Sequence, residues 1–344
     1  MITTKGVNIG RFFHFTWKYI LALIVFNSLI GVLYYFKIIN IYIAWLPVSI
    51  VGTAVAFYVG FKNNNAYGRL WEARKIWGGI VNDSRAWGMM IDSYINDLFT
   101  DKKGNDEFIK KSKKRLIYRH IAWLYIHRSQ LLIPTSWEHI SQKGKTKKDA
   151  TKFQNKYGIG TLDNNLTEDQ LKFFLPDDEY DRLLKYSNTA TQIINEQSRD
   201  LQELRKQNYI DDFRHMELEQ ILRSFYTLQG KNERIKKFPL PRQYAIMSRY
   251  FVGIFIFLLP FSMIPELIKV GDWGIWLSIP ITVLIGWIYI MMEIIGDFSE
   301  NPFQGMPNDI PMLSLCRTIE IDLREMLNEK DLPPKIKDNK GILL

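Results

Sequence analysis

Cysteine and catalytic motifs are scarce in this 344-residue sequence. Cys316 is its single cysteine, so an intrachain disulfide and a secreted, disulfide-stapled scaffold are excluded. The histidines form neither an HExxH motif nor a Cys/His cluster, and no GxGxxG, Walker A or GxSxG motif occurs. We therefore predict that the protein is not an enzyme and that it has no catalytic residues, no metal site and no cofactor.

Charged residues are missing from four apolar runs, although the mean hydropathy of −0.13 is that of a soluble protein. The runs are Tyr19–Phe36, Ile41–Phe61, Tyr250–Pro265 and Trp273–Met292. A helix needs about 17–25 apolar residues to cross a bilayer core, and the third run reaches this length with Leu267 and Ile268 or by starting near Ala245. The first run is too long for a signal peptide and no A-x-A site follows it, so we interpret it as a retained membrane helix. The sequence predicts four transmembrane helices.

The connections between the runs predict the topology. Lys37–Asn40 and Glu266–Asp272 are short, whereas residues 62–249 are polar and contain most of the 45 Lys and Arg residues. The basic residues near the ends of the runs lie on the side of this long segment, and they are Lys5, Arg11, Lys18, Lys62, Arg69, Arg74, Arg234, Lys236, Lys237, Arg242 and Arg249. The positive-inside rule makes this side cytoplasmic, together with both termini, in the inner membrane of the cell. This orientation and a solvated surface explain the net charge of +9, so no nucleic acid is expected as a partner.

The segment between the second and third runs has helical periodicity. Apolar residues from Tyr67 to Leu98 follow at steps of three, four or seven. No proline lies between Pro47 and Pro134, so the second membrane helix can continue as a long rod. The further expected elements are helical stretches at Phe108–Leu132 and Asp178–Leu228, the latter interrupted near Asn208–Asp212, a loop at Ser141–Asn165 and a helix start at Leu166.

No alternating β pattern of useful length occurs, so the fold class is all-α. We expect an integral membrane protein with a large cytoplasmic helical domain. Its expected divisions are 1–61 for the N-terminal segment and the first two membrane helices, 62–243 for the cytoplasmic helical domain, 244–298 for the last two membrane helices, and 299–344 for a cytoplasmic C-terminal helix and tail.

Polar residues cluster where the membrane helices end. Arg69, Glu72, Arg74 and Arg85 follow the second run, and Glu293, Asp297 and Glu300 follow the fourth. We interpret both clusters as ion pairs between helices, because buried charges are tolerated when they are paired. Cys316 is interpreted as a small buried residue of an amphipathic helix, with a reactive thiol as the alternative.

Ionisable residues are missing from the interior of the apolar runs, which argues against an ion-coupled carrier. A pore lined by apolar residues of several subunits, closed by dewetting, fits this composition better. Thr53, Phe57 and Phe61 occur at i, i+4 and i+8 and therefore share one stripe of a helix. The stripe can line a pore or pack against a neighbouring helix of the same chain, and periodicity alone favours packing.

Three separated motifs resemble those of the bacterial bestrophin-like channels. The first is YGRLWEARKIW at 67–77, which contains Arg69, Trp71, Glu72 and Arg74. The second is Glu233-Arg-Ile followed by Pro239-Leu-Pro241. The third comprises ENPF at 300–303 with Asn301, Pro302 and Phe303, PNDIP at 307–311 with Asp309, and CRTIE at 316–320. The resemblance spans nearly the whole chain. It implies a homopentamer in the lipid bilayer with four membrane helices per subunit, a single central pore for inorganic ions lined by the second helix, and a wide cytoplasmic chamber.

The resemblance also implies roles for individual residues. Thr53, Phe57 and Phe61 correspond to a hydrophobic neck, although the neck usually has an apolar residue at the first of these positions. A second constriction, at the cytoplasmic exit, falls at Phe213 in the segment IDDFR.

Calcium gating is not expected. Animal members bind Ca²⁺ through an acidic cluster after Asn-Pro-Phe, but residues 304–309 here contain one carboxylate. A Ca²⁺ site needs six to eight oxygen ligands. We instead expect Asn308 and Asp309 to cap a helix that begins near Pro311.

Taken with the resemblance, these features predict passive chloride conduction. Phe rings that present their positive edges to a pore favour an anion, and animal relatives conduct chloride. Bacterial relatives can prefer monovalent cations, so a sodium-selective channel of the same fold is the alternative. A membrane-anchored scaffold without conduction is a rival class of protein, and an enzyme of lipid metabolism is a third.

Overall fold

The computed structural model describes residues 1–3, 9–101, 103–157, 171–339 and 341–343. Over these ranges the chain is all-α, as predicted, and its only β features are the isolated bridges that Ile342 forms with Ile2 and with Asn339. The chain divides into two compact units. The apolar unit comprises Thr4–Leu70 and Pro239–Asn301, and the polar unit comprises Met1–Thr3, Trp71–Phe238 and Pro302–Leu344.

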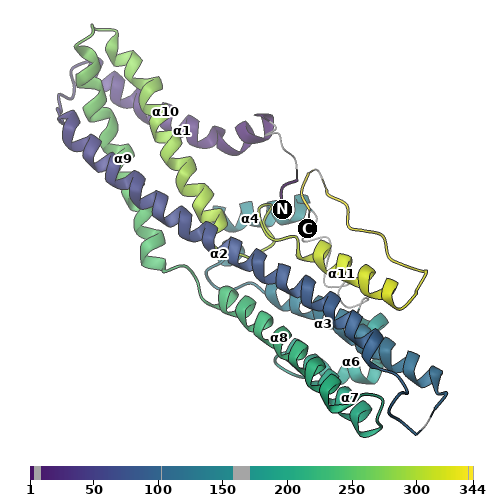
Figure 1. The fold of residues 1–344 in the computed structure, drawn as a ribbon. Coiled ribbons are helices and arrows are strands. Elements are labelled where there is room, and N and C mark those ends of the chain that lie inside the picture. The colour runs from purple at the N-terminus through teal and green to yellow at the C-terminus, as the bar shows by residue number, and fades with distance from the viewer. Residues whose placement is uncertain (4–8, 102, 158–170, 340, 344) are drawn as a thin grey trace. The chain divides into compact units, whose positions relative to one another are not determined.

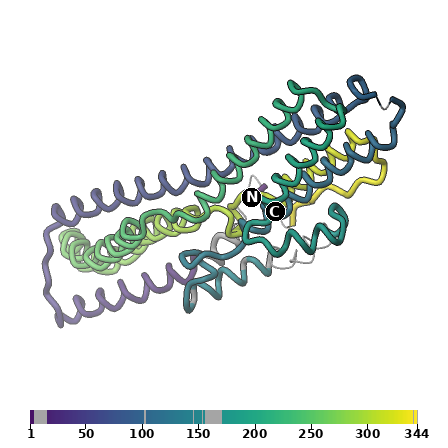
Figure 2. Tube along the Cα trace, turned by 90° about the horizontal axis from the view of Figure 1, so that it is seen from below, coloured from purple at the N-terminus to yellow at the C-terminus, as the bar shows by residue number. Residues whose placement is uncertain are grey.

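The apolar unit consists of α1 (Ile9–Tyr35), the first part of α2 (Trp45–Tyr94), α9 (Arg242–Ile268) and α10 (Gly274–Ser299), shown in Figure 1. Among the described residues, four helices are long and apolar enough to cross a membrane. Each predicted run overlaps one of these helices, although the second begins before α2, and α9 includes both extensions expected for the third run. α9 and α10 lie side by side in Figures 1 and 2.

Interhelical packing holds α2 close to α9. Val48, Val55 and Val59 on one face of α2 form a core with Val252, Phe255 and Leu259 of α9. Gly52 is required at this crossing, because a Cβ there would lie 2.7 Å from Cε2 of Phe255. A second core joins Ile30 and Tyr34 of α1 to Phe261 and Ile264 of α9 and Ile275 of α10.

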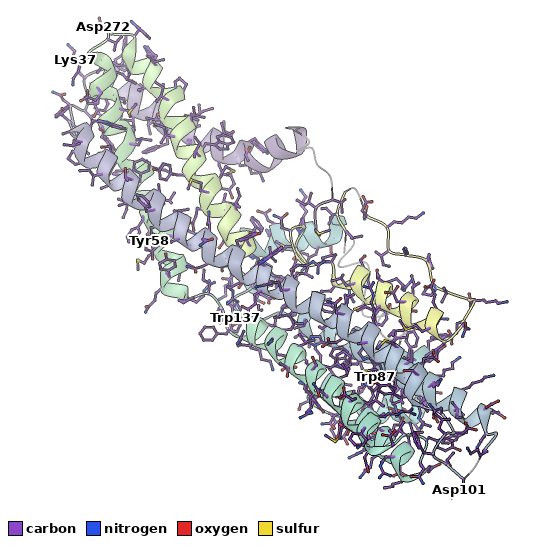
Figure 3. The ribbon with its side chains drawn as sticks, in the orientation of Figure 1. Lys37, Tyr58, Trp87, Asp101, Trp137 and Asp272 are labelled. Carbon is purple, nitrogen blue, oxygen red and sulfur yellow. The ribbon has the colours of Figure 1, made fainter. Side chains whose placement is uncertain are left out.

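The two short connections lie at the same end of the apolar unit. Lys37 and Asp272, one from each connection, are both labelled at this end in Figure 3. Arg242 and Arg249 lie in the first part of α9, away from its connection to α10, and Lys62 lies in the interior of α2, after its apolar part. Of the basic residues that predicted the orientation, Lys5 and the side chain of Arg11 lie outside the described residues.

α2 is one continuous helix of 50 residues, so the predicted rod is confirmed. Beyond Leu70 it belongs to the polar unit, which also contains α3 (Asp106–Leu132), η1 (His139–Ser141), α4 (Lys145–Tyr157), α6 (Asp177–Leu183), α7 (Thr189–Lys206), α8 (Asp212–Lys237) and α11 (Met312–Met326). The interruption predicted near Asn208–Asp212 is confirmed: Asn208 has a φ of 59°, and Asp211 caps α8 by accepting from the backbone N–H of Phe213 at 2.8 Å.

Two predictions for the polar unit are wrong. The expected loop at Ser141–Asn165 contains α4, because its Lys and Ala residues favour a helix and Ala150 is buried on it. The expected helical region Asp178–Leu228 has a second break between α6 and α7, where Asn188 caps α7 by accepting from the N–H of Thr191. The helix start predicted at Leu166 lies outside the described residues.

The core of the polar unit is aromatic. Trp77, Trp87 and Trp123 are fully buried together with His120 and His127. Burial lowers the pKa of His120 to about 3 and that of His127 to about 4, so both rings are neutral near pH 7.

Cys316 is buried on α11, which confirms the interpretation from the sequence. Its burial raises the pKa of the thiol to about 12. Burial and the raised pKa argue against the alternative of a reactive thiol.

Candidate functional site

The stripe of Thr53, Phe57 and Phe61 lies on the face of α2 opposite its packed face. The side chains of Phe57 and Phe61 are 65% and 62% exposed, and Thr53 is exposed as well. Packing against a helix of the same chain, which periodicity alone favoured, is therefore wrong. Periodicity could not decide this question, because a stripe that faces outward has the same spacing as one that faces a core.

Thr53 presents less polarity than its residue type suggests. Its hydroxyl donates to the backbone carbonyl of Ser49 at 2.9 Å, one turn earlier in α2. This hydrogen bond satisfies the hydroxyl within the helix. Thr53 is therefore closer in polarity to the apolar residue that the neck usually has at this position than the sequence indicates.

Along the same face the stripe changes from apolar to polar. Leu46 and Ile50 precede Thr53 and are exposed, and Asn64 and Asn65 follow Phe61 and are exposed. Gly60 lies beside Phe61, and a Cβ there would meet nothing within 4 Å. The exposed face thus offers an aromatic band with amide groups directly after it.

A buried ion pair joins α2 to α10 immediately after the stripe. The ammonium of Lys62 lies 2.5 Å from Oε1 of Glu293, and the Lys62 side chain is fully buried. The hydroxyl of Ser248 on α9 donates to the other oxygen of Glu293. Three helices are therefore connected through one carboxylate.

The other acidic residues after the fourth run are also paired. Asp297 lies 3.4 Å from Arg249, Glu300 lies 3.1 Å from Arg242, and Arg69 donates to the backbone carbonyl of Glu300 at 2.9 Å. The prediction of interhelical ion pairs is confirmed, although the basic partners come mostly from α9. Sequence reasoning missed Lys62 as a partner, and its position directly after an apolar run was the available signal.

Two charged residues on the second part of α2 pair with other helices of the polar unit. Glu72 pairs with Arg234 of α8 at 2.7 Å, and Arg85 pairs with Asp322 of α11 at 2.8 Å. Trp71 is half exposed and Arg74 is half-buried on the same helix. These contacts hold α2 against α8 and α11.

Asp309 closes the loop before α11. Its carboxylate accepts the backbone N–H groups of Phe303 at 3.0 Å, Gly305 at 2.9 Å and Ile310 at 2.8 Å. Phe303 and Gly305 have φ angles of 71° and 73°, and the carboxylate compensates for this unusual backbone. Burial raises the pKa of Asp309, while the three N–H donors act in the opposite direction.

The prediction that Asn308 and Asp309 cap α11 is wrong. Pro311 occupies the N-cap position, without a side-chain hydrogen bond, and Asn308 is exposed. The loop curls back before the helix starts, so the carboxylate of Asp309 is used by the loop itself.

A second buried ion pair supports this loop. The ammonium of Lys236 lies 2.5 Å from Oε1 of Glu138 and donates to the carbonyl of Phe303 at 3.5 Å. Burial lowers the pKa of Lys236 and raises that of Glu138, and their mutual attraction opposes both changes. No local sequence pattern indicates this pair, because Glu138 and Lys236 lie far apart in the sequence and only the fold brings them together.

The Asn-Pro-Phe motif is buried. Phe303 is fully buried, and the amide of Asn301 donates to Oε1 of Glu300 at 3.2 Å. Within the described ranges, no group of three or more His, Cys, Asp or Glu side chains could hold a metal ion.

Phe213 lies at the start of α8, and its side chain is 83% exposed. The capping carboxylate of Asp211 fixes the backbone at this position.

Comparison with known proteins identifies the class. The apolar helices and the outward-facing stripe are those of an all-α membrane protein, and a family model described as bacterial/fungal bestrophin protein matches residues 10–325. The chain belongs to the bestrophin family. The family and its relatives indicate a channel and not an enzyme.

The relatives cover most of the chain. The voltage-dependent anion channel-forming protein YneE of Escherichia coli (strain K12) is 24% identical over 84% of this chain and 79% of its own length. The voltage-dependent anion channel-forming protein mll4386 of Mesorhizobium japonicum is 26% identical over 84% of this chain and 77% of its own. The crystal structure of a bacterial bestrophin homolog from Klebsiella pneumoniae has a TM-score of 0.70 at 21% identity, covering 91% of this chain and 98% of that chain, which shows a shared fold.

Proposed function

We propose that the protein is a passive anion channel that conducts chloride through a central pore lined by α2 of several subunits. The observation that carries this proposal is the exposed stripe of Thr53, Phe57 and Phe61, in a family of channels. Relatives of this chain are named as anion channel-forming proteins.

A homopentamer supplies what one subunit lacks. One exposed stripe cannot enclose a conduit, whereas five copies of α2 around an axis can. The exposed amides of Asn64 and Asn65 follow the aromatic band on the same side of α2. Lipid would leave such amides without partners, so their position favours a water-filled path on this face.

The proposed neck contains no fixed side-chain charge. Lys62 follows Phe61 directly, but its ammonium is buried and paired with Glu293. Selectivity then depends on the aromatic rings, whose positive edges favour an anion over a cation. Dewetting of the apolar band would close the pore without any moving gate.

Orientation follows from the basic residues. The apolar unit has Lys62, Arg242 and Arg249 at the end opposite its two short connections. The positive-inside rule places this end, both termini and the polar unit on the cytoplasmic side of the inner membrane. In that arrangement Phe213 forms a second aperture at the cytoplasmic exit.

Reversal potentials in asymmetric sodium chloride test the function. Purified protein should have the mass of five copies in mild detergent, and in a planar bilayer its current should reverse near the equilibrium potential of chloride. Reversal near the sodium potential would replace anion selectivity with cation selectivity. A pentamer without current would indicate a scaffold, and a stable monomer would remove the pore.

Calcium should have no effect on the current between nanomolar and millimolar concentrations. Both oxygens of Asp309 are used by backbone N–H groups, and Glu138 is used by Lys236. Neither carboxylate is free for a cation that needs six to eight oxygens. Recording one channel while Ca²⁺ is exchanged on the side of the polar unit checks this expectation, and a steep response would contradict it.

A further inference from the structure

Arg128 is a buried arginine on α3. Its side chain lies in the interior at 5% exposure, and it makes no hydrogen bond or ion pair with any residue that the structure describes. Other buried arginines of the polar unit differ in this respect. Arg119 contacts Glu179 and Asp200, and Arg317 and Arg324 both contact Glu320.

An unpaired guanidinium in the interior is energetically unfavourable. Arginine stays protonated in proteins and presents five N–H donors, and at 5% exposure the Arg128 side chain keeps little contact with water. Burial lowers the pKa of Arg128, but the group keeps its charge at any physiological pH. A compensating group of negative charge is therefore missing from the described contacts.

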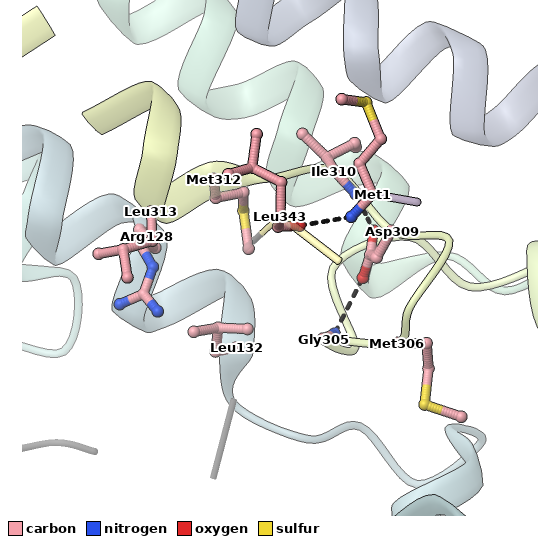
Figure 4. Close-up of a pocket in the computed structure, with 10 residues that line it drawn as sticks. All are labelled: Met1, Arg128, Leu132, Gly305, Met306, Asp309, Ile310, Met312, Leu313 and Leu343. Carbon is pink, nitrogen blue, oxygen red and sulfur yellow. Dashed lines mark hydrogen bonds between the residues drawn. The ribbon is translucent and has the colours of Figure 1, made fainter. Parts of the chain in front are cut away.

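A small cavity adjoins this arginine. Its volume is about 30 Å³, and its walls include Arg128 and Leu132 of α3, Leu313 of α11, Met306 of the preceding loop, and Leu343 (Figure 4). This volume holds about one particle of the size of water. Apart from Arg128, Asp309 and the amino group of Met1, which donates to the carbonyl of Leu343, the walls are mainly apolar.

Asp309 does not compensate for Arg128. Both of its oxygens accept backbone N–H groups, and the two side chains lie on opposite sides of the cavity in Figure 4. The described contacts thus leave a satisfied carboxylate at one side and an unsatisfied cation at the other.

We propose that this cavity binds a small monovalent anion of the halide class on the guanidinium of Arg128. A volume of about 30 Å³ has room for a single small ion such as chloride or bromide. A guanidinium is weakly hydrated, which suits an ion that gives up its own water readily among apolar walls. The bound ion neutralises Arg128 and joins α3 to α11 and the loop before it. This site is structural, and it uses none of the residues proposed for the neck.

Melting temperatures in two salts test the site. When the chloride concentration is about tenfold above the dissociation constant of the site, the intact oligomer should melt about 3 °C higher in sodium chloride than in sodium gluconate. Arg128→Met should melt at the same temperature in both salts, because it removes the ion's partner. The shift belongs to this site only if the variant loses it, since chloride in the pore would shift both proteins equally.

Arg119→Met is the matched control. It breaks a paired buried arginine, so it should lower the melting temperature in both salts and keep the difference between them. Arg128→Met should still conduct, which separates a failure of this site from a failure of the channel function.

Crystals of the unaltered protein grown in sodium bromide provide a second measurement. An anomalous peak beside Arg128 is expected. Equal melting temperatures in both salts, a chloride shift that persists in Arg128→Met, or a carboxylate of a neighbouring subunit seated on Arg128 in those crystals would each overturn the proposal.

Discussion

Replacing Lys62 with methionine is expected to destabilise the protein by about 3–5 kcal/mol, because it leaves the carboxylate of Glu293 buried without its cation. The hydroxyl of Ser248 would then be the remaining partner of that carboxylate among the described residues. The loss should appear as a lower melting temperature and a smaller yield of oligomer in detergent. Methionine fills a volume close to that of the lysine stem, so a cavity does not explain the effect.

Two controls separate charge from packing. The double variant Lys62→Met/Glu293→Leu removes both charges and should recover most of the lost stability. Arg249→Gln breaks the ion pair between Arg249 and Asp297, in which the Arg249 side chain is 70% exposed. It should lower the stability by about 0–1 kcal/mol. A double variant as unstable as Lys62→Met alone would show that this lysine acts through its shape.

Local signals in the sequence were sufficient for most of the helices. Charge-free runs mark α1, α9 and α10, because a membrane helix buries its whole backbone and tolerates few charges. The missing prolines between Pro47 and Pro134 marked the continuity of α2. The helix α4 was missed because it is polar and short, so its stability depends on contacts that no local pattern encodes.

Partners were harder to predict than positions. The acidic cluster was recognised as paired, yet Lys62 and Glu293 are separated by 231 positions, and only the fold brings them together. Asp309 was assigned to a cap because its spacing suits one, whereas the loop turns it back on Phe303 and Gly305. The isolation of Arg128 has no sequence signal at all, since it is a property of what surrounds the residue.

The proposed neck is expected to respond to truncation as a gate and not as a core. Phe57→Ala or Phe61→Ala should widen the apolar constriction, let water stay in it and raise the open probability several-fold. Both side chains are mostly exposed within the chain, so neither truncation opens an intrachain cavity. Oligomer recovery should therefore be unchanged. Phe255→Ala on α9 is the matched control, because Phe255 is buried, and it should cost about 3–5 kcal/mol.

Thr53→Ile tests the same neck in the opposite direction. In each subunit, isoleucine replaces the threonine hydroxyl, which donates to the carbonyl of Ser49, with a larger apolar side chain. The constriction should therefore lose its water more readily, and the current should fall. Single-channel recording of the three variants, beside oligomer recovery for each, distinguishes the cases. If Phe57→Ala and Phe61→Ala lower recovery as Phe255→Ala does, the rings pack between subunits. If the current is unchanged in all three, the stripe does not face the pore, and the gate must be sought at Phe213, the proposed second aperture, whose side chain is exposed.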